Sequence, residues 1–193
     1  MKSIAVFCGS RPGASALYME EARAMGRKLA ESGIELVYGG AAVGLMGAVA
    51  DGALEAGGRA IGVLPQFLQD REIAHRGLTE LIVVDSMHER KQRMAELADG
   101  FAALPGGPGT MEEYFEIFTW GQLGLHGKPC GLLNVGGYFD PLLAMFERME
   151  QEGFMQPQHR GMVLADGSPD GLLEQMLAYE PPAVKTYLTP GRT

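Results

Sequence analysis

The sequence predicts an α/β protein with a single domain, in which a doubly wound, parallel, Rossmann-like sheet carries helices on both faces. Seven short apolar runs alternate with longer segments that have the apolar spacing of helices. The runs are nearly all apolar, which is typical of strands covered on both faces. Strict alternation of strand and helix favours right-handed crossovers and therefore a parallel sheet.

The first half of the chain has four predicted strands, each a short apolar or β-branched run: Ser3–Cys8, Glu35–Tyr38, Ala60–Leu64 and Glu80–Val84. Two long helices are predicted between the first three strands, at Ser15–Ser32 and Leu45–Ala56. Gly33 and Gly57 follow them at the positions where helix C-caps belong. The longer, mostly polar connection Pro65–Arg76 is expected to act as a flap.

The second half has three further predicted strands, which are again short and apolar: Gly100–Leu104, Cys130–Asn134 and Met162–Ala165. Apolar spacing and start signals predict four more helices: Met87–Leu97, Thr110–Leu123, Tyr138–Glu152 and Ser168–Tyr179. Together these elements form one predicted catalytic domain, residues 1–180. Residues 181–193 are rich in proline and are expected to form an extended tail.

Composition narrows the classes of partner. A net charge of −8 argues against nucleic acid and against anionic membrane surfaces. No apolar run reaches spanning length, and the chain opens on a predicted strand without the apolar core of a signal peptide. Cys8 and Cys130 lie far apart in apolar segments, which favours reduced thiols over a disulfide. These observations predict a cytoplasmic protein.

The segment Leu104–Glu113, with sequence LPGGPGTMEE, is the most informative part of the chain. Its glycines let backbone N–H groups approach a ligand closely, and the helix that follows adds unpaired N–H donors. Such a turn is suited to hold a phosphate. Two carboxylates follow one turn later, which suggests chemistry on a phosphorylated molecule. Alternatively, Thr110 and Glu113 form a capping box and Glu113 only caps its own helix.

The segment Ser86–Lys91, with sequence SMHERK, is the second motif. Ser86 and Glu89 fit a capping box, which would put the cations of Arg90 and Lys91 near a helix N-terminus. The helix dipole disfavours cations there, so a bound anion would compensate. The alternative is a solvated basic face.

Other catalytic patterns do not occur in the sequence. The first turn is not G-x-G-x-x-G, and neither a P-loop, a zincin motif nor G-x-S-x-G is present. No cluster of Cys, His and Asp has metal-ligand spacing, so we expect no metal. The turn Gly39–Gly44 is either a relaxed nucleotide turn or a tight strand-to-helix connection.

These residues together resemble the Lonely Guy (LOG) family, whose members were once labelled lysine decarboxylases. The family signature P-G-G-x-G-T-x-x-E is matched by Pro105–Glu113, and its companion M-H-x-R-K by Met87–Lys91. The opening F-C-G-S and the turn G-G-x-x-x-G-L-M-G are also similar, so the resemblance covers most of the chain. Arg11 and Pro108 depart from the pattern, and neither lies at an expected catalytic position.

The resemblance implies a hydrolase that needs no cofactor or metal. Such phosphoribohydrolases cleave the N-glycosidic bond of N6-substituted adenosine 5′-monophosphates, and some act on AMP. They release the free cytokinin or adenine base and ribose 5-phosphate. The resemblance also implies a homodimer with its pocket near the interface, and a nucleoside 5′-monophosphate as its substrate. No lysine site for pyridoxal phosphate is evident, which argues against the decarboxylase label.

Roles follow for the matching residues. Glu113 is expected to hold the ribose hydroxyls and to orient or activate water beside an oxocarbenium-like state. Arg90 is expected to orient that carboxylate and to add positive charge. The remaining expected phosphate and substrate contacts are Gly106, Gly107, Gly109, Thr110, Lys91, Met87, Cys8, Gly9, Ser10, Gly39 and Gly40.

Two alternatives of other classes remain at this point. A non-catalytic nucleotide or cofactor carrier would keep the glycine-rich cradle, but it has no need of a carboxylate beside an anion. A DNA-processing module of similar fold is disfavoured by the acidic charge. The aromatic residues that follow Glu113 are expected to pack in the core or against a second subunit.

Overall fold

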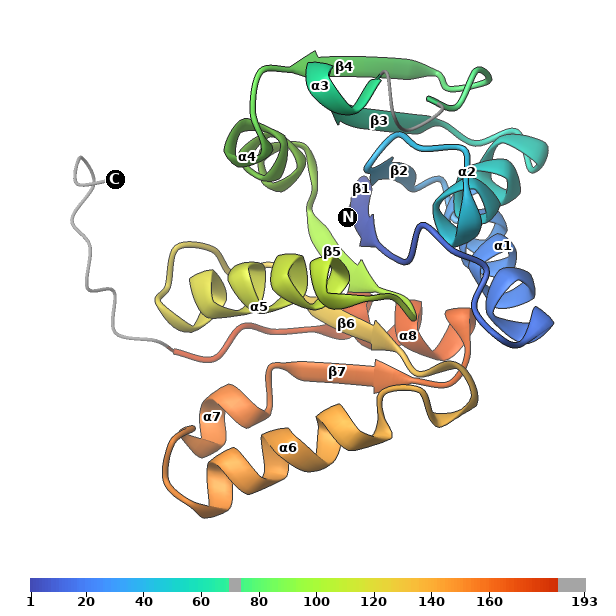
Figure 1. Ribbon diagram of the computed structural model, residues 1–193. Coiled ribbons are helices and arrows are strands. Elements are labelled where there is room, and N and C mark those ends of the chain that lie inside the picture. Colours follow the sequence, from blue (N-terminus) through green and yellow to red (C-terminus); the bar gives the residue numbers. More distant parts are fainter. Residues whose placement is uncertain (70–73, 184–193) are drawn as a thin grey trace.

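The computed structural model describes residues 1–69 and 74–183 (Figure 1). It has one seven-stranded sheet in the order β4-β3-β2-β1-β5-β6-β7, and every neighbouring pair in this order is parallel. The strands are β1 (Ser3–Phe7), β2 (Glu35–Tyr38), β3 (Ala60–Pro65), β4 (Glu80–Val84), β5 (Gly100–Ala103), β6 (Cys130–Leu133) and β7 (Val163–Asp166). Their positions agree closely with the predicted runs.

The strand order places a topological switch between β1 and β5. From β1 the chain winds outward through β2, β3 and β4, then returns across the sheet to β5 and winds the other way. Open α/β sheets bind ligands in the crevice at the carboxyl ends of the two strands beside such a switch. The turns after Phe7 and Ala103 lie at that edge, since these two residues are register partners.

Helices cover both faces, which confirms the doubly wound prediction. One face packs α1 (Ala16–Glu31), α2 (Gly44–Glu55) and α8 (Pro169–Ala178) against the sheet. The other face packs α4 (Met87–Leu97), α5 (Pro108–Gln122) and α6 (Asp140–Gln151). Three one-turn elements complete the described chain: α3 (Gln66–Gln69), η1 (Val135–Gly137) and α7 (Pro157–Arg160). None of the helices within the described residues is long and apolar enough to cross a membrane.

Several helix ends follow the sequence signals. Gly33 and Gly57 have φ values of 68° and 77°, as expected of residues that end a helix in the left-handed region. At the start of α4, the Glu89 N–H donates to Ser86 Oγ over 3.1 Å. The Glu89 carboxylate accepts from the Asp85 N–H over 2.8 Å. The predicted cap at Ser86 is therefore confirmed.

The start of α5 differs from the prediction. The helix begins at Pro108, with Gly107 as N-cap, so Thr110 is its third residue and the capping box at Thr110 was wrong. Proline has no N–H to lose and its fixed φ suits the first position, so the helix extends back to Pro108. Glu113 therefore lies in the second turn of α5 and does not cap the helix.

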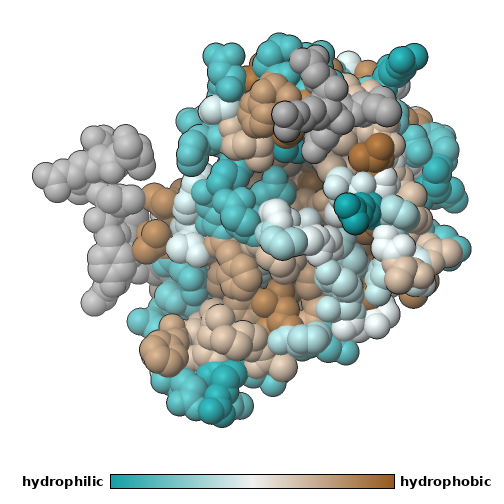
Figure 2. Space-filling model, viewed as in Figure 1, coloured by the Kyte–Doolittle hydropathy of each residue, from teal (hydrophilic) through white to brown (hydrophobic). Residues whose placement is uncertain are grey.

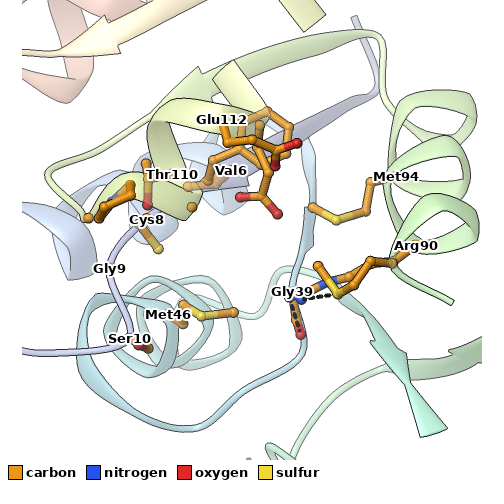
Figure 3. Close-up of a pocket in the computed structure, with 16 residues that line it drawn as sticks. Val6, Cys8, Gly9, Ser10, Gly39, Met46, Arg90, Met94, Thr110 and Glu112 are labelled. Carbon is orange, nitrogen blue, oxygen red and sulfur yellow. Dashed lines mark hydrogen bonds between the residues drawn. The ribbon is translucent and has the colours of Figure 1, made fainter. Parts of the chain in front are cut away.

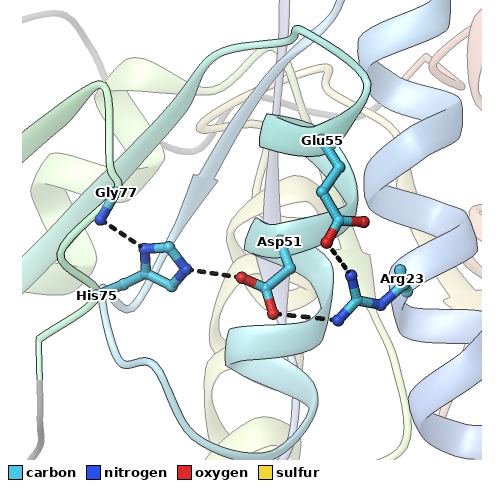
Figure 4. Close-up of polar contacts among 5 residues, drawn as sticks. All are labelled: Arg23, Asp51, Glu55, His75 and Gly77. Atoms are coloured by element: carbon cyan, nitrogen blue, oxygen red, sulfur yellow. Dashed lines mark hydrogen bonds and ion pairs between the residues drawn. The ribbon is translucent and has the colours of Figure 1, made fainter.

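The connection after β3 is attached to the rest of the fold near the turn after β2. Beyond α3, residues 70–73 of the expected flap lie outside the described residues. The His75 N–H then donates to the Gly40 carbonyl over 3.0 Å. Figure 4 shows His75 Nε2 bonded to Asp51 over 3.0 Å, and Asp51 paired with Arg23 over 3.2 Å. Arg23 also pairs with Glu55, so α1, α2 and this segment are joined. Most of the predicted tail, residues 184–193, also lies outside the described residues.

Candidate active site

A pocket of about 330 Å³ opens at the carboxyl edge of the sheet beside the β1–β5 switch (Figure 3). The turns after β1 and β2 and the first turns of α4 and α5 form its walls. Side chains of Thr110, Arg90 and Met46 enter it from three different elements. The pocket brings together ten of the residues named from the sequence: Cys8, Gly9, Ser10, Gly39, Met87, Arg90, Gly107, Gly109, Thr110 and Glu113.

Backbone hydrogen bonds join the three glycine-rich turns. The Gly9 N–H donates to the Pro105 carbonyl, and the Leu45 N–H donates to the Gly9 carbonyl, each over 3.0 Å. Gly44 has a φ of 57°, and a Cβ there would lie 2.3 Å from the Ser10 carbonyl carbon. Only glycine allows this close approach. The turn after β1 is therefore held between the other two.

The glycines of the segment Gly106–Thr110 have two different functions. A Cβ on Gly106 would lie 2.2 Å from Thr110 Oγ1, so this glycine is needed for packing. A Cβ on Gly107 or Gly109 would meet no atom within 4 Å, and both residues line the pocket. The first turn of a helix leaves N–H groups without partners, and the helix dipole favours negative charge there. The arrangement suits an anion such as phosphate.

Arg90 extends from α4 into the pocket and is only 6% exposed. Its Nη2 donates to the Gly39 carbonyl over 3.0 Å (Figure 3). Its Nε is buried without a hydrogen-bond partner, and no ion pair within residues 1–69 and 74–183 includes Arg90. A buried charge is costly unless it is paired. Arg90 is thus a cation available to an anionic ligand in the pocket.

Glu113 lines the pocket from α5, across from Arg90. Burial raises the pKa of Glu113 to about 7, with the charge of Arg90 acting in the opposite direction and that of Glu112 adding to the rise. Among the described residues Glu113 forms no ion pair with Arg90, so the arginine acts on this carboxylate through its field. A carboxyl group that titrates near neutrality is suited to general acid–base chemistry.

Three of the residues named from the sequence lie outside the lining of this pocket. Lys91 Nζ bonds to Glu112 over 2.7 Å and to Glu116 over 3.0 Å, so it ties α4 to α5. Gly40 directs its carbonyl at the His75 N–H. Gly106 lines a neighbouring hollow on the other side of the cradle.

Sequence reasoning missed two methionines of the lining, Met46 and Met94. Met87, Arg90 and Met94 have the spacing of one helix face, which is the signal that could have found Met94. Met46 belongs to the G-L-M-G turn, where only its neighbours were singled out. Burial also raises the pKa of the Cys8 thiol, so Cys8 is a neutral, packing side chain. Within the described residues no group of three or more His, Cys, Asp or Glu could hold a metal ion.

Fold and site together define a Rossmann-like α/β protein with an anion-binding turn and a carboxylate at its switch point. A family model described as "Possible lysine decarboxylase" matches residues 46–176. A protein of Rhodococcoides fascians named cytokinin riboside 5′-monophosphate phosphoribohydrolase is 52% identical over 173 residues, covering 89% of this chain and 87% of that protein. An Arabidopsis thaliana protein of the same name is 46% identical over 180 residues, covering 93% and 83%. The chain therefore belongs to this family, the LOG family.

Solved structures of low identity share the fold. The molybdenum cofactor carrier protein of Chlamydomonas reinhardtii superposes with a TM-score of 0.71 at 24% identity, covering 92% of this chain and 99% of that one. DNA processing protein A of Helicobacter pylori gives 0.58 at 17% identity, covering 92% and 80%. At these identities the likeness concerns the fold alone.

Proposed function

We propose that the protein is a phosphoribohydrolase that cleaves the N-glycosidic bond of N6-substituted adenosine 5′-monophosphates, releasing the free base and ribose 5-phosphate. The observation that carries this proposal is one pocket that combines an anion cradle, the buried cation of Arg90 and the half-buried carboxyl group of Glu113. The names of the curated relatives support the same activity.

The residues have distinct roles in the proposed reaction. Backbone N–H groups of Gly107, Gly109 and Thr110 hold the 5′-phosphate, which places the ribose next to the second turn of α5. As the bond between C1′ and the base breaks, positive charge develops on the sugar, and the Glu113 carboxylate stabilises it. Glu113 also orients the water whose oxygen bonds to C1′. Glu113 accepts one proton from that water, and the departing base takes up one proton at the nitrogen that was bonded to C1′, so the reaction as a whole adds OH to C1′ and H to the base.

The 5′-phosphate is expected to control catalysis. Wild-type kcat/KM should be at least about a hundredfold higher for AMP than for adenosine, because charge-assisted hydrogen bonds to the phosphate hold the sugar in place. The measurement is release of free base from AMP, isopentenyl-AMP and adenosine. Equal kcat/KM for AMP and adenosine would contradict the proposed cradle.

A non-catalytic carrier of nucleotides or cofactors is the second candidate function, since the Chlamydomonas carrier protein shows that this fold also occurs in a carrier. A carrier needs the cradle, but it gains nothing from a half-buried carboxyl group facing an anion. The same assay separates the two functions. A carrier would bind AMP, as seen by calorimetry, and release no base from any of the three compounds.

Gly39 is part of the proposed site because it leaves room for Arg90. A Cβ at Gly39 would lie 1.9 Å from Arg90 Nη2, so Gly39→Ala must displace the guanidinium. We expect the variant to fold and to lose at least about tenfold in kcat, since one electrostatic contact is misplaced. Base release and circular dichroism measure the two effects. Gly109→Ala tests the cradle separately, because a Cβ at Gly109 would meet no atom within 4 Å.

A homodimer with its pocket near the interface is part of the proposal. Helix α5 is apolar on more than one side, and α6 covers only part of it through Phe146, whose ring lies 5.7 Å from Phe115 and 5.4 Å from Phe118. Figure 2 shows apolar residues over α5, beside the hydrophilic surface of α4. Leu123 and Leu125, at the end of this helix, are 41% and 40% exposed. Light scattering after size exclusion tests the dimer, and an active species of 20.7 kDa would refute it.

The setting expected for this enzyme is the cytoplasm. Cys8 and Cys130 are both free and buried, which is compatible with a reducing compartment. The proposed reaction needs no cofactor.

A further inference from the structure

Tyr138 contacts the phosphate cradle from outside the pocket. Its hydroxyl donates to the Gly106 carbonyl oxygen over 2.5 Å. Tyr138 lines a hollow of about 300 Å³ that lies next to the active-site pocket and shares Gly9, Ser10 and Gly107 with it. The resemblance to the LOG family assigns no role to this tyrosine, and neither does the proposed reaction.

The bond has a geometric consequence for the next residue. In a planar trans peptide the C=O and the N–H point in opposite directions. The Gly106 carbonyl is turned toward Tyr138 and the neighbouring hollow, so the Gly107 N–H is turned the other way. Gly107 lines the active-site pocket, and the N–H therefore faces the place proposed for the phosphate. Donation to the carbonyl also polarises the peptide, which strengthens the N–H as a donor.

The tyrosine ring is 40% exposed and packs on its inner side against two other rings. It packs edge-on against Tyr18, with ring centroids 5.8 Å apart, and against Phe139, at 5.0 Å. The Phe139 N–H donates to Asn134 Oδ1 over 2.7 Å, which closes the turn after β6. On the far side of the cradle, Gly106 has Thr110 against it. Tyr138 and Thr110 therefore contact Gly106 from two sides, at a position where glycine would otherwise allow many backbone conformations.

We propose that Tyr138 is a positioning residue that orients the Gly107 N–H toward the 5′-phosphate of the substrate. This inference rests on the proposed function, because it concerns the same cradle. It predicts that the hydroxyl of Tyr138 matters for phosphorylated ligands and not for ligands without phosphate.

The test compares Tyr138→Phe with Tyr18→Phe as the matched control, since each variant loses one hydroxyl and keeps its ring. For Tyr138→Phe we expect kcat/KM for AMP to fall about fivefold, mainly through KM, the effect of one hydrogen bond. The value for adenosine should stay unchanged. Tyr18→Phe should leave both values as in the wild type. An unchanged ratio of AMP to adenosine in Tyr138→Phe, or an equal loss in Tyr18→Phe, would overturn the proposal.

A binding measurement keeps this test independent of the proposed reaction. Calorimetry with ribose 5-phosphate should show about fivefold weaker binding to Tyr138→Phe, with no change for Tyr18→Phe. If the wild type released no base at all, the proposed function would fail, and this measurement would still decide the role of Tyr138. Equal affinity for wild type and Tyr138→Phe would overturn that role.

A double-mutant cycle tests the route through Gly107. Gly107 has a φ of −90° and an extended ψ, just outside the φ range that proline imposes, so Gly107→Pro removes the N–H and shifts the backbone slightly. In that background, adding Tyr138→Phe should weaken ribose 5-phosphate no further. Additive losses would contradict the route. Thermal melting of each variant checks folding. If Gly107→Pro melts early, Gly107→Ala replaces it in the cycle. Gly107→Ala keeps the N–H, so the effect of Tyr138→Phe should be retained in that background.

Discussion

Glu113→Gln is expected to lower kcat for base release from AMP at least about a hundredfold, with the fold intact. Glutamine has nearly the same shape, so the substitution removes only the charge that we propose stabilises the oxocarbenium-like state and orients water. Glu116→Gln on the same helix is the matched control, because Glu116 also pairs with Lys91 but does not line the pocket, and its loss is expected to affect turnover far less. Near wild-type turnover in folded Glu113→Gln would contradict the mechanism.

The pH dependence of the wild type offers a check on the same group. Since Glu113 has a pKa of about 7 and acts as the carboxylate, kcat/KM should rise with pH up to about 7 and level off above it. Stability should change in the opposite direction. Because the pKa of Glu113 is higher in the folded protein, the protonated carboxyl group contributes to the free energy of unfolding. This contribution is complete below the ordinary pKa of 4.5 and is lost as the pH rises through about 7. Glu113→Gln has no group that titrates at this position. Urea titrations at pH 5 and pH 8 should therefore show a smaller difference in the free energy of unfolding for the variant than for the wild type.

Arg90→Ala is expected to lower kcat/KM for AMP at least about a hundredfold. The substitution removes a buried cation that no carboxylate pairs within the described chain, and with it the positive charge that we propose acts on the phosphate and the leaving group. Because Arg90 holds the pKa of Glu113 down, the rising limb of the pH profile should also move to higher pH. Arg90→Lys should not restore activity, since lysine lacks the planar group that reaches the Gly39 carbonyl.

Arg93→Ala is the control for the loss of a positive charge from α4. Arg93 is exposed and, among the residues that the structure describes, pairs with Glu96 alone, on its own helix, so its removal should leave turnover within about twofold of the wild type. Circular dichroism of both variants separates loss of function from loss of fold. An Arg90→Ala variant that folds, turns over normally and keeps the wild-type pH profile would exclude the assigned role.

Much of the fold could be predicted from the sequence because local signals and tertiary structure agree. The apolar runs became parallel strands, and glycines ended helices where expected. The start of α5 was misplaced because two local signals competed, Pro108 for the first helical position and Thr110 for a cap, and the proline decided.

The composition of the site was harder to predict, because it depends on which segments meet in space. Lys91 follows Arg90 directly, and both were expected to serve the site, Arg90 beside the Glu113 carboxylate and Lys91 as a phosphate contact. Helical rotation turns Lys91 toward the carboxylates of α5 and Arg90 toward Gly39. Met46 lies in the pocket only because the turns after β1 and β2 are bonded to each other through Leu45. No pattern along the chain encodes such long-range contacts.

The switch between β1 and β5 divides the residues of the proposed site between two parts of the chain. Arg90 and its anchor Gly39 come from the windings on one side of β1, whereas Glu113 and the cradle come from the windings that begin with β5. Neither half of the chain carries both charged groups of the site. The Gly9–Pro105 hydrogen bond joins the two parts of the chain, at the point where both contribute to one wall of the pocket. Turnover is therefore a direct readout of whether the two halves of the chain are joined.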